Sequence, residues 1–281
     1  MKITVFGATG LLGKTLMRIG ASDDLTGLSS LDADLRDPAQ VSDAVKRTSP
    51  DWIILAAAYT DVDGCETNRD LAFDVNARGA AIVAQAAKQS GGARLLFISS
   101  DYVFDGTKTT PYEINDPISP RSVYGESKAE AEEEIRRILP DACIVRTSWL
   151  YGIGGKCFPD TILKLAAKRS EIDVVNDQRG SPTHAEDLAS AIIQLCHANA
   201  RGIVHATNRG ECSWFDFAKE IVAGAGMSTE VRPTTSDKFV RPAPRPAYSV
   251  LSPASLDTYG IVMPEWKTAL RNYLAQRATQ L

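Results

Sequence analysis

The sequence predicts an α/β protein built on a doubly wound parallel sheet. Three observations support this fold class: a glycine-rich turn between the first strand and the first helix, an alternation of strand-like and helix-like segments, and a large apolar fraction. The chain has 281 residues, of which 44% are hydrophobic and 23% are charged. This length is ample for a large core. Alternating strands and helices are what a parallel sheet with crossover helices requires.

The first strand and the turn after it form the most specific local pattern. Residues 2–6 are typical of a buried strand, and the segment 7–13, Gly-Ala-Thr-Gly-Leu-Leu-Gly, follows directly and opens an apolar helix. Gly7 permits the tight bend, Gly10 lets the backbone approach a pyrophosphate, and Gly13 lets the helix pack closely on the strand. The free N–H groups at the helix start then bind the anion. A glycine-rich turn without a ligand is the alternative, and the strand and helix context disfavours it.

The later elements follow from periodicity and from helix start signals. Asp37 before Pro38 is a cap followed by a proline at the first helical position. After residue 150 the pattern is less regular and contains a proline-rich stretch over 232–246. The expected strands are 2–6, 25–29, 52–56, 94–99, 143–147, 172–175 and 203–206, and the expected helices are 11–20, 38–48, 70–90, 124–138, 158–169, 185–197, 213–224 and 264–279.

These elements predict two parts. We expect a Rossmann-type doubly wound parallel sheet over residues 1–150, which forms the dinucleotide-binding core and includes the helix with Tyr124 and Lys128. We expect residues 151–281 to form mostly a smaller C-terminal substrate-binding lobe, with some segments returning to the core. The last helix is expected to pack back on the body of the protein.

Tyr124 and Lys128 lie one helical turn apart. A phenol with a pKa of about 10 is a poor acid toward a carbonyl, and a cation one turn away lowers that pKa. The hydroxyl of Ser100, at the end of the strand beneath this helix, would polarise the substrate oxygen. These groups are suited to hydride transfer to a ketone, although Tyr-x-x-x-Lys alone is a weak pattern that a solvated helix face also gives. We interpret two further pairs on this helix as ion pairs of a solvated face: Glu132 with Arg136, and Glu133 with Arg137.

Charge and cysteine content exclude several classes. The formal net charge of -4 offers no basic surface for nucleic acid. Five scattered cysteines, odd in number and without a C-x-x-C pair, indicate buried or free thiols in a reducing cytoplasm. The amino terminus enters a strand at once and no apolar run approaches ~18 residues, so we expect neither export nor a membrane span. The three histidines lack metal-ligand spacing, and no metal site is assigned.

Further motifs carry a resemblance to a known family. They are AAAYTDVD over 56–63 with Glu66, VNARG over 75–79, ISSDYVFDG over 98–106, YGESK over 124–128, RTSWLYG over 146–152, DQRGSPT over 177–183 and RPAYS over 245–249. With these, the chain resembles an extended short-chain dehydrogenase/reductase nearly end to end. More narrowly, it is similar to the dTDP-4-dehydrorhamnose reductases. The glycine turn, with two residues between its first two glycines, has the short-chain dehydrogenase form.

The resemblance implies reduction of a 4-keto sugar nucleotide to dTDP-L-rhamnose. Tyr124 would protonate the C4 oxygen as hydride arrives from the nicotinamide, Lys128 would hold the nicotinamide ribose, and Ser100 stands where the family usually has threonine. The implied cofactor contacts are Gly7, Thr9, Gly10, Leu11, Leu12, Gly13, Ser29, Asp34, Leu35, Ala56, Ala57, Ala58, Tyr59, Asn76, Ser99, Tyr124 and Lys128. The implied substrate contacts are Thr60, Ser100, Asp101, Tyr102, Trp149 and Arg245.

Three of these substrate contacts have structural alternatives. Trp149 could be an ordinary core residue, and Asp101 could cap a loop. Arg245 fits a diphosphate contact because a guanidinium fork matches phosphate oxygens, whereas its neighbouring prolines equally allow a structural loop.

Cofactor choice depends on the end of the second strand. NAD-specific sites place an acid there that binds the ribose 2′-hydroxyl and repels a 2′-phosphate. The segment 25–30 ends in the hydroxyls of Ser29 and Ser30, with no acid to exclude NADPH and no arginine or lysine nearby to select it. We therefore predict NADPH use with tolerance of NADH. In the family, the positions of Asp34 and Leu35 touch the adenine ring.

Other functions of the same superfamily are disfavoured or left open. Dehydratases follow the catalytic hydroxyl residue with Asp and Glu, but Tyr102 occupies the second position here. Epimerases usually hold NAD with an acid after the second strand. The segment 25–30 lacks that acid, so an epimerase is disfavoured too. A reductase of another 4-keto-6-deoxy sugar stays open, as does a non-catalytic subunit like the regulatory subunit of methionine adenosyltransferase. The resemblance also allows a homodimer and a magnesium ion at a dimer contact, for which no glutamates are assigned.

Overall fold

A six-stranded parallel sheet forms the centre of the molecule. The computed structural model describes residues 1–20 and 22–279. The strand order is β10-β5-β4-β3-β1-β2, and every neighbouring pair is parallel. The fold class predicted from the sequence is therefore confirmed. The strands are β1 (Lys2–Phe6), β2 (Asp24–Leu28), β3 (Trp52–Leu55), β4 (Arg94–Ser100), β5 (Cys143–Thr147) and β10 (Gly202–His205).

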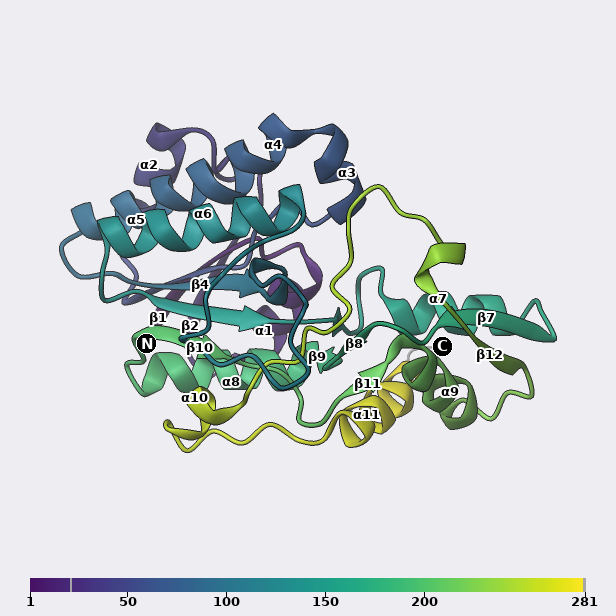
Figure 1. Cartoon of the computed structure of the whole chain (residues 1–281). Helices are drawn as coiled ribbons and strands as arrows, with labels where there is room; N and C mark the ends of the chain where they lie inside the picture. The colour runs from purple at the N-terminus through teal and green to yellow at the C-terminus, as the bar shows by residue number, and fades with distance from the viewer. Residues whose placement is uncertain (21, 280–281) are drawn as a thin grey trace.

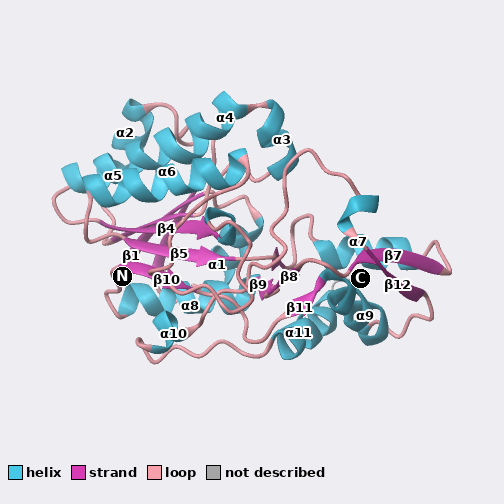
Figure 2. Ribbon diagram, viewed as in Figure 1, coloured by secondary structure: helices cyan, strands magenta, loops and turns pink. Residues whose placement is uncertain are grey.

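Helices cover both faces of this sheet, as Figures 1 and 2 show. On one face α2 (Pro38–Thr48), α5 (Gly79–Gln89) and α6 (Val123–Ile138) bury aliphatic side chains against the strands. On the other face α1 (Leu11–Ile19) and α8 (Ala185–His197) do the same. Strands buried on both faces are nearly all apolar, which is why β3 reads Trp-Ile-Ile-Leu.

The segment between β3 and α5 differs from the expected single helix over 70–90. It contains α3 (Val62–Thr67), α4 (Arg69–Phe73) and a π-helical turn, η1 (Asp74–Arg78), before α5 begins. The π turn surrounds Asn76, whose buried side chain is hydrogen-bonded outside its own helix. Single π turns commonly mark functional sites. Periodicity alone cannot reveal this insertion, because the flanking segments keep a helical pattern.

The second part of the chain forms a smaller lobe at the carboxyl ends of the strands (Figure 1). Its core unites aromatic and aliphatic side chains of three helices, among them Phe217, Trp266 and Tyr273. Its elements are β6 (Leu150–Tyr151), α7 (Phe158–Ala166), β7 (Glu171–Val175), β8 (Arg179–Gly180), β9 (Thr183–His184), β11 (Cys212–Ser213), α9 (Trp214–Gly224), β12 (Glu230–Thr234), η3 (Ser236–Lys238) and α11 (Trp266–Ala278).

Two features of this lobe were not expected. β12 pairs in parallel with β7, although it carries Pro233 and begins the proline-rich stretch. A proline is tolerated there because the two strands form a small isolated pair with an open edge. The prediction that the last helix packs on the body is wrong, since α11 joins the core of the smaller lobe.

Two segments of the second half belong to the central sheet. β10 is its edge strand beside β5, and α8 packs against α1 beneath it. The short helix α10 (Ala254–Asp257) lies beside β10. We keep residue 150, where β6 begins, as the proposed boundary between the dinucleotide-binding core and the lobe.

Candidate functional site

A cleft of about 770 Å³ opens at the carboxyl ends of the central strands. In doubly wound folds this edge of the sheet is where ligands bind. The cleft brings together most of the residues that the sequence singled out. Those lining it are Gly7, Thr9, Gly10, Leu11, Leu12, Gly13, Ser29, Asp34, Leu35, Ala56, Ala57, Ala58, Thr60, Ser99, Ser100, Asp101, Tyr102, Tyr124, Lys128 and Trp149.

The glycine turn forms one wall of the cleft, and it cannot carry side chains at two positions. Gly7 has a φ of 89°, in the left-handed region that favours glycine. A Cβ on Gly13 would lie 2.0 Å from the carbonyl oxygen of Gly7. Glycine at these positions therefore lets α1 begin directly behind β1, with its first N–H groups facing the cleft. The turn can bind a dinucleotide pyrophosphate.

The start of α6 places Tyr124 in the cleft. Ser122 caps this helix by accepting a hydrogen bond from the Gly125 N–H at 3.2 Å. A Cβ on Gly125 would lie 2.2 Å from the carbonyl oxygen of Tyr102, so only glycine permits the helix to approach the end of β4 this closely. The rings of Tyr102 and Tyr124 consequently meet edge to face, with centroids 5.6 Å apart.

Tyr124 is held in its neutral form. Burial raises the pKa of its hydroxyl, and the charge of Asp101 raises it further, whereas a hydrogen bond with Ser100 opposes both effects. This differs from the sequence prediction that Lys128 lowers the pKa of Tyr124. A neutral phenol is the proton-donating form, so Tyr124 carries the proton that a carbonyl oxygen would take.

Lys128 is buried beneath Tyr124. Its Nζ donates a hydrogen bond to the carbonyl oxygen of Ile98 at 2.7 Å and lies 4.0 Å from the centre of the Phe97 ring. Burial lowers the pKa of this ammonium group to about 7, and the charge of Glu132 acts in the opposite direction. The lysine is thus anchored on β4 and poised between its two protonation states.

Glu132 is not part of a solvated face, so the predicted pairing with Arg136 is wrong. Its carboxylate accepts two hydrogen bonds from Arg146, at 2.9 and 2.6 Å, and one from the hydroxyl of Ser99 at 2.5 Å. The side chains of Glu132 and Arg146 are only 3% and 2% exposed. This buried ion pair joins α6 to β4 and β5 one turn from Lys128. The predicted pair of Glu133 with Arg137 is wrong as well, because Arg137 pairs with Glu134.

Asp101 is a second buried acid of the cleft. Its Oδ1 accepts a hydrogen bond from Ser100 at 2.9 Å, whereas Oδ2 has no regular hydrogen-bond partner among the described residues. Burial raises the pKa of this carboxyl group to about 6, and nearby Ser249 and Ser100 partly oppose that rise. Asp101 lines the cleft, so its carboxyl group is suited to binding a polar ligand.

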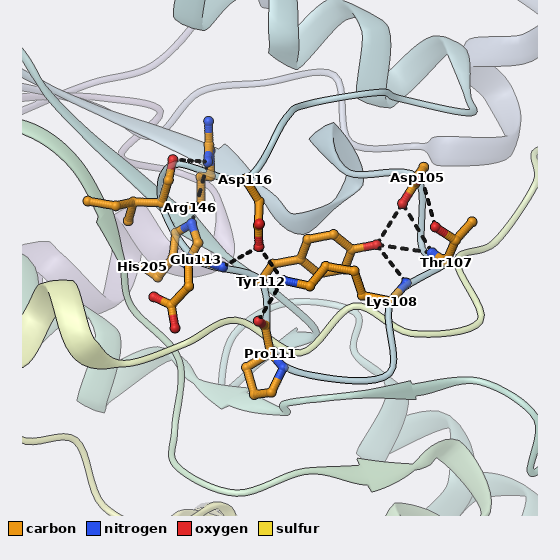
Figure 3. A network of polar contacts seen from close by, with 10 residues as sticks. Asp105, Thr107, Lys108, Pro111, Tyr112, Glu113, Asp116, Arg146 and His205 are labelled. Carbon is orange, nitrogen blue, oxygen red and sulfur yellow. Dashed lines mark hydrogen bonds and ion pairs between the residues drawn. The ribbon is translucent and has the colours of Figure 1, made fainter.

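A polar network fixes the loop that leads from Asp101 to α6 (Figure 3). The hydroxyl of Tyr112 donates to Asp105 at 2.7 Å and accepts from the Thr107 N–H at 3.0 Å. The Tyr112 ring stacks on Phe104 with centroids 4.2 Å apart. Arg146 reaches the same loop through the carbonyl oxygen of Ile114. Because this loop joins Ser100 to Tyr124 along the chain, its rigidity sets their relative positions.

Three predicted residues lie outside the cleft lining, namely Tyr59, Asn76 and Arg245. Asn76 accepts a hydrogen bond from the Tyr59 N–H at 2.7 Å and donates to the Tyr59 carbonyl oxygen and to Ser127. It therefore fastens the segment after β3 to α6, which is a positioning task. Arg245 forms an ion pair with Asp63 at 3.0 Å and is 19% exposed. In this structure Arg245 ties the proline-rich segment to the start of α3.

Aromatic residues form the far end of the cleft. Trp149 stacks on Trp214 with centroids 3.5 Å apart and planes 7° apart, and Phe158 packs against the same Trp214. Trp149 also has a φ of 46°, a strained conformation for a non-glycine residue that is typical of functional sites. Two further residues that line the cleft, Trp214 and Lys156, were not expected from the sequence. The available signals were an aromatic residue at a helix start and a lysine after a glycine-rich loop.

Two charged residues that were not expected from the sequence follow β2, one beside the cleft and one in its lining. Asp32 accepts hydrogen bonds from the N–H and the hydroxyl of Ser29, at 2.8 and 2.6 Å. Arg36 lines the cleft together with Ser29 and Ser30. The prediction that neither an acid nor a basic side chain lies near the end of the second strand is therefore wrong.

Outside the cleft, the described residues include buried cysteines and a second cavity but no cluster of metal ligands. Within residues 1–20 and 22–279, no three His, Cys, Asp or Glu side chains gather as metal ligands would. In the same residues no helix has the length and apolar character needed to cross a bilayer. All five cysteines are buried and unpaired. A second cavity of about 700 Å³, between α7, α9 and α11, contains none of the predicted site residues.

Comparison with known families gives a match over nearly the whole chain. Residues 1–279 match the family model described as RmlD substrate binding domain. The dTDP-4-dehydrorhamnose reductase of Mycobacterium tuberculosis is 40% identical over 287 residues, covering 99% of this chain and 93% of that protein. A probable dTDP-4,6-dihydroxy-2-methyloxan-3-one 4-ketoreductase of Streptomyces antibioticus is 39% identical over 276 residues, covering 96% and 94%.

Solved structures agree with this match. The crystal structure of dTDP-4-dehydrorhamnose reductase from Bacillus anthracis, in complex with NADP, superposes with a TM-score of 0.95 at 39% identity. It covers 98% of this chain and 100% of that one. The similarity therefore includes the glycine turn, the cleft and the smaller lobe.

Proposed function

The chain belongs to the RmlD substrate binding domain family, and we propose that it reduces the C4 keto group of dTDP-4-dehydro-6-deoxy-L-mannose to give dTDP-L-rhamnose. It is an oxidoreductase that uses a nicotinamide cofactor and acts on a dTDP-linked keto sugar. The proposal assigns the cofactor to the glycine-turn end of the cleft and the sugar nucleotide to the aromatic end.

The observation that carries the proposal is the meeting of Ser100, Tyr124 and Lys128 in one cleft with the glycine turn. The fit to a dinucleotide rests on Gly7 and Gly13, where a Cβ would strike the backbone of Ala57 and of Gly7, so that only glycine lets the turn pack closely against β3 and α1 at the edge of the cleft. When bound, NADPH supplies the hydride that reduces the carbonyl carbon. The residues of this chain have to supply the proton, orient the carbonyl and exclude water.

We assign the proton to Tyr124. Its neutral hydroxyl donates the proton to the C4 oxygen as the carbon–oxygen π bond opens, so the sugar gains one C–H and one O–H bond and the tyrosine is left as phenolate. The ammonium group of Lys128, anchored on Ile98, stabilises that phenolate electrostatically. Ser100 polarises the same oxygen, because its hydroxyl already lies at the end of β4 within reach of Tyr124.

The aromatic end of the cleft and Asp101 are assigned to the sugar nucleotide. Trp149 and Trp214 offer flat apolar surfaces for a sugar or a base, and the carboxyl group of Asp101, which lines the cleft, can accept a hydrogen bond from a sugar hydroxyl. Lys156, which also lines the cleft, offers a charge for the diphosphate. For Arg245 the same role requires release from Asp63.

A second substrate has a specific observation in its favour. The Streptomyces antibioticus relative is described as a 4-ketoreductase of a different dTDP sugar, at nearly the same identity as the dehydrorhamnose reductase. The active groups that reduce a C4 ketone are the same for both substrates. The reductase proposal therefore holds for the class of dTDP-linked 4-keto-6-deoxy sugars, and rhamnose is the favoured member.

The test is NADPH oxidation over a panel of nucleotide-linked 4-keto sugars. We expect consumption with dTDP-4-dehydro-6-deoxy-L-mannose and, as product, dTDP-L-rhamnose identified by NMR. If another keto sugar is turned over faster, that sugar becomes the assigned substrate in place of dTDP-4-dehydro-6-deoxy-L-mannose. No turnover with any of them, together with stable binding to a methionine adenosyltransferase, would instead establish the non-catalytic alternative.

A further inference from the structure

Residues 239–248 form a proline-rich strap that crosses from the smaller lobe toward α3. Figure 1 shows the chain between β12 and α10 arching toward that helix. Pro242, Pro244 and Pro246 lie at every second position of the strap. Each proline ring fixes its own φ and restricts the residue before it, so the strap is stiff. A contact at its middle therefore orients the whole segment.

Asp63, in the first turn of α3, holds the middle of the strap. Its Oδ1 accepts a hydrogen bond from the Ala243 N–H at 3.2 Å and lies 3.0 Å from Nη2 of Arg245. Its Oδ2 lies 3.2 Å from Nε of Arg241. Arg245 also donates from Nη1 to the carbonyl oxygen of Ala243 at 3.1 Å. One carboxylate thus meets two guanidinium groups and a backbone N–H of the strap.

The charge of Asp63 compensates two positive charges that would otherwise repel each other. Removing it takes away the attraction to α3 and leaves Arg241 and Arg245 facing each other as like charges. The side chains of Asp63 and Arg245 are 23% and 19% exposed, so water screens this pair only in part. Asp63 therefore determines whether the strap stays against α3.

The strap also packs on the loop that follows Ser100. A Cβ on Gly106 would lie 2.4 Å from the Cβ of Pro246, so the two segments are in close contact. The guanidinium carbon of Arg245 lies 5.9 Å from the centre of the Tyr102 ring, which is within the range of a cation–π interaction. Since Tyr102 lines the cleft, the strap supports a side chain of the cleft wall.

The start of α3 belongs to the same wall. Thr60 and Val62 line the cleft, and Asp63 directly follows Val62. Asp63 itself does not line the cleft. It stands between the wall and the strap, so its contacts set the position of Arg245, and with it Tyr102, relative to this wall.

We propose that Asp63 is a positioning residue, which holds the strap against α3 and keeps Arg245 on the ring of Tyr102 so that Tyr102 is oriented for the sugar nucleotide. The inference rests on the proposed reduction of a dTDP-linked keto sugar, for which Tyr102 is an expected substrate contact. Asp63 acts through the strap and takes part in neither the hydride nor the proton transfer.

The test compares Asp63→Asn with the wild type in two measurements. Hydrogen–deuterium exchange, read by mass spectrometry on peptides that cover the strap, should become faster by roughly three- to ten-fold without any added nucleotide. In steady-state turnover, the KM for dTDP-4-dehydro-6-deoxy-L-mannose should rise by roughly three- to ten-fold. The kcat and the KM for NADPH should stay within about two-fold of the wild type, since the change concerns sugar binding.

A second variant separates the charge effect from a general loss of structure. Asp63→Asn combined with Arg241→Gln removes one of the two repelling cations, and should recover part of the KM and slow the exchange of the strap again. The matched control is Asp70→Asn, which removes the same charge from an exposed position of α4 outside the cleft lining. It should change neither measurement.

Three results would overturn the assignment of Asp63. They are unchanged exchange of the strap in Asp63→Asn, an unchanged KM for the sugar nucleotide despite faster exchange, and an equal rise in the KM of both substrates. A wild-type protein that reduces none of the keto sugars would overturn the proposed function instead, and the exchange measurement would still decide whether Asp63 holds the strap.

Discussion

Replacing Glu132 by glutamine tests whether the buried ion pair beneath the cleft holds α6 in place. The substitution keeps the size of the side chain and removes the charge that faces Arg146 and accepts from Ser99. Both charged side chains are at most 3% exposed, so water cannot replace the lost partner. Breaking a buried pair from one side typically costs about 3–5 kcal/mol, and we expect a loss of this size in the free energy of unfolding.

The loss of the Glu132 charge should also change the protonation of Lys128 in the cleft. Burial lowers the pKa of Lys128 to about 7, and the charge of Glu132 opposes that fall. Removing this charge therefore lowers the pKa of Lys128 further and reduces its protonated fraction. Turnover of Glu132→Gln should therefore fall more at pH 8 than at pH 6, relative to the wild type.

Urea unfolding followed by circular dichroism measures the stability, with Glu133→Gln as the matched control on the exposed side of the same helix. The control should change the free energy of unfolding by less than about 0.5 kcal/mol. The double variant Glu132→Leu with Arg146→Met should be less destabilised than Glu132→Gln, since it leaves no unpaired charge. If Glu132→Gln and the control are equally stable, the pair does not hold α6 and the reasoning fails.

Three further substitutions probe the same frame. Gly125→Ala places a Cβ 2.2 Å from the Tyr102 carbonyl oxygen, and should cost about 1–3 kcal/mol and lower turnover by ~10²-fold, whereas Gly92→Ala, with open space around it, should do neither; equal rates would contradict this. Asp101 has its pKa raised to about 6, so the folded state binds more protons than the unfolded state between pH 4 and 6, and stability falls as pH rises through that window. Asp101→Asn should abolish this fall, of the order of 3 kcal/mol in urea unfolding at pH 4 and 6.5, and an unchanged pH dependence would exclude Asp101 as its source. Asn76→Ala loses the three hydrogen bonds of a buried side chain and should cost about 2–4 kcal/mol and raise the KM for NADPH. A KM and a stability like those of the wild type would show that the amide positions nothing.

Local patterns predicted the features that depend on neighbours in the chain. The first 20 residues contain the strand over 2–6, the glycine turn and the helix behind it. Tyr124 and Lys128 are likewise close in sequence, one helical turn apart. The cap of α2 by Asp37 likewise needs only adjacent residues, and the structure shows its carboxylate accepting from Ala39 and Gln40.

Features that depend on distant partners were misjudged. Glu132 looked solvated because the four-residue spacing suggested Arg136, whereas its partner Arg146 arrives on β5 and is buried with it. The π turn at Asn76 arises from hydrogen bonds to segments 17 and 51 residues away. Arg36 stands beyond the segment in which a phosphate-binding residue was sought, and only the turn after β2 brings it back to the cleft. The periodicity of a sequence carries no information about contacts between segments that are far apart in the chain.

The most direct test of the central claim follows a deuterium label from the cofactor into the sugar. With NADPH deuterated at the transferable C4 position of the nicotinamide, the account predicts dTDP-L-rhamnose with one deuterium at the sugar C4. It also predicts that Tyr124→Phe binds NADPH but forms this product ~10²-fold more slowly or worse, as expected when a general acid is removed. Deuterium at another carbon, or a Tyr124→Phe rate near that of the wild type, would contradict the account.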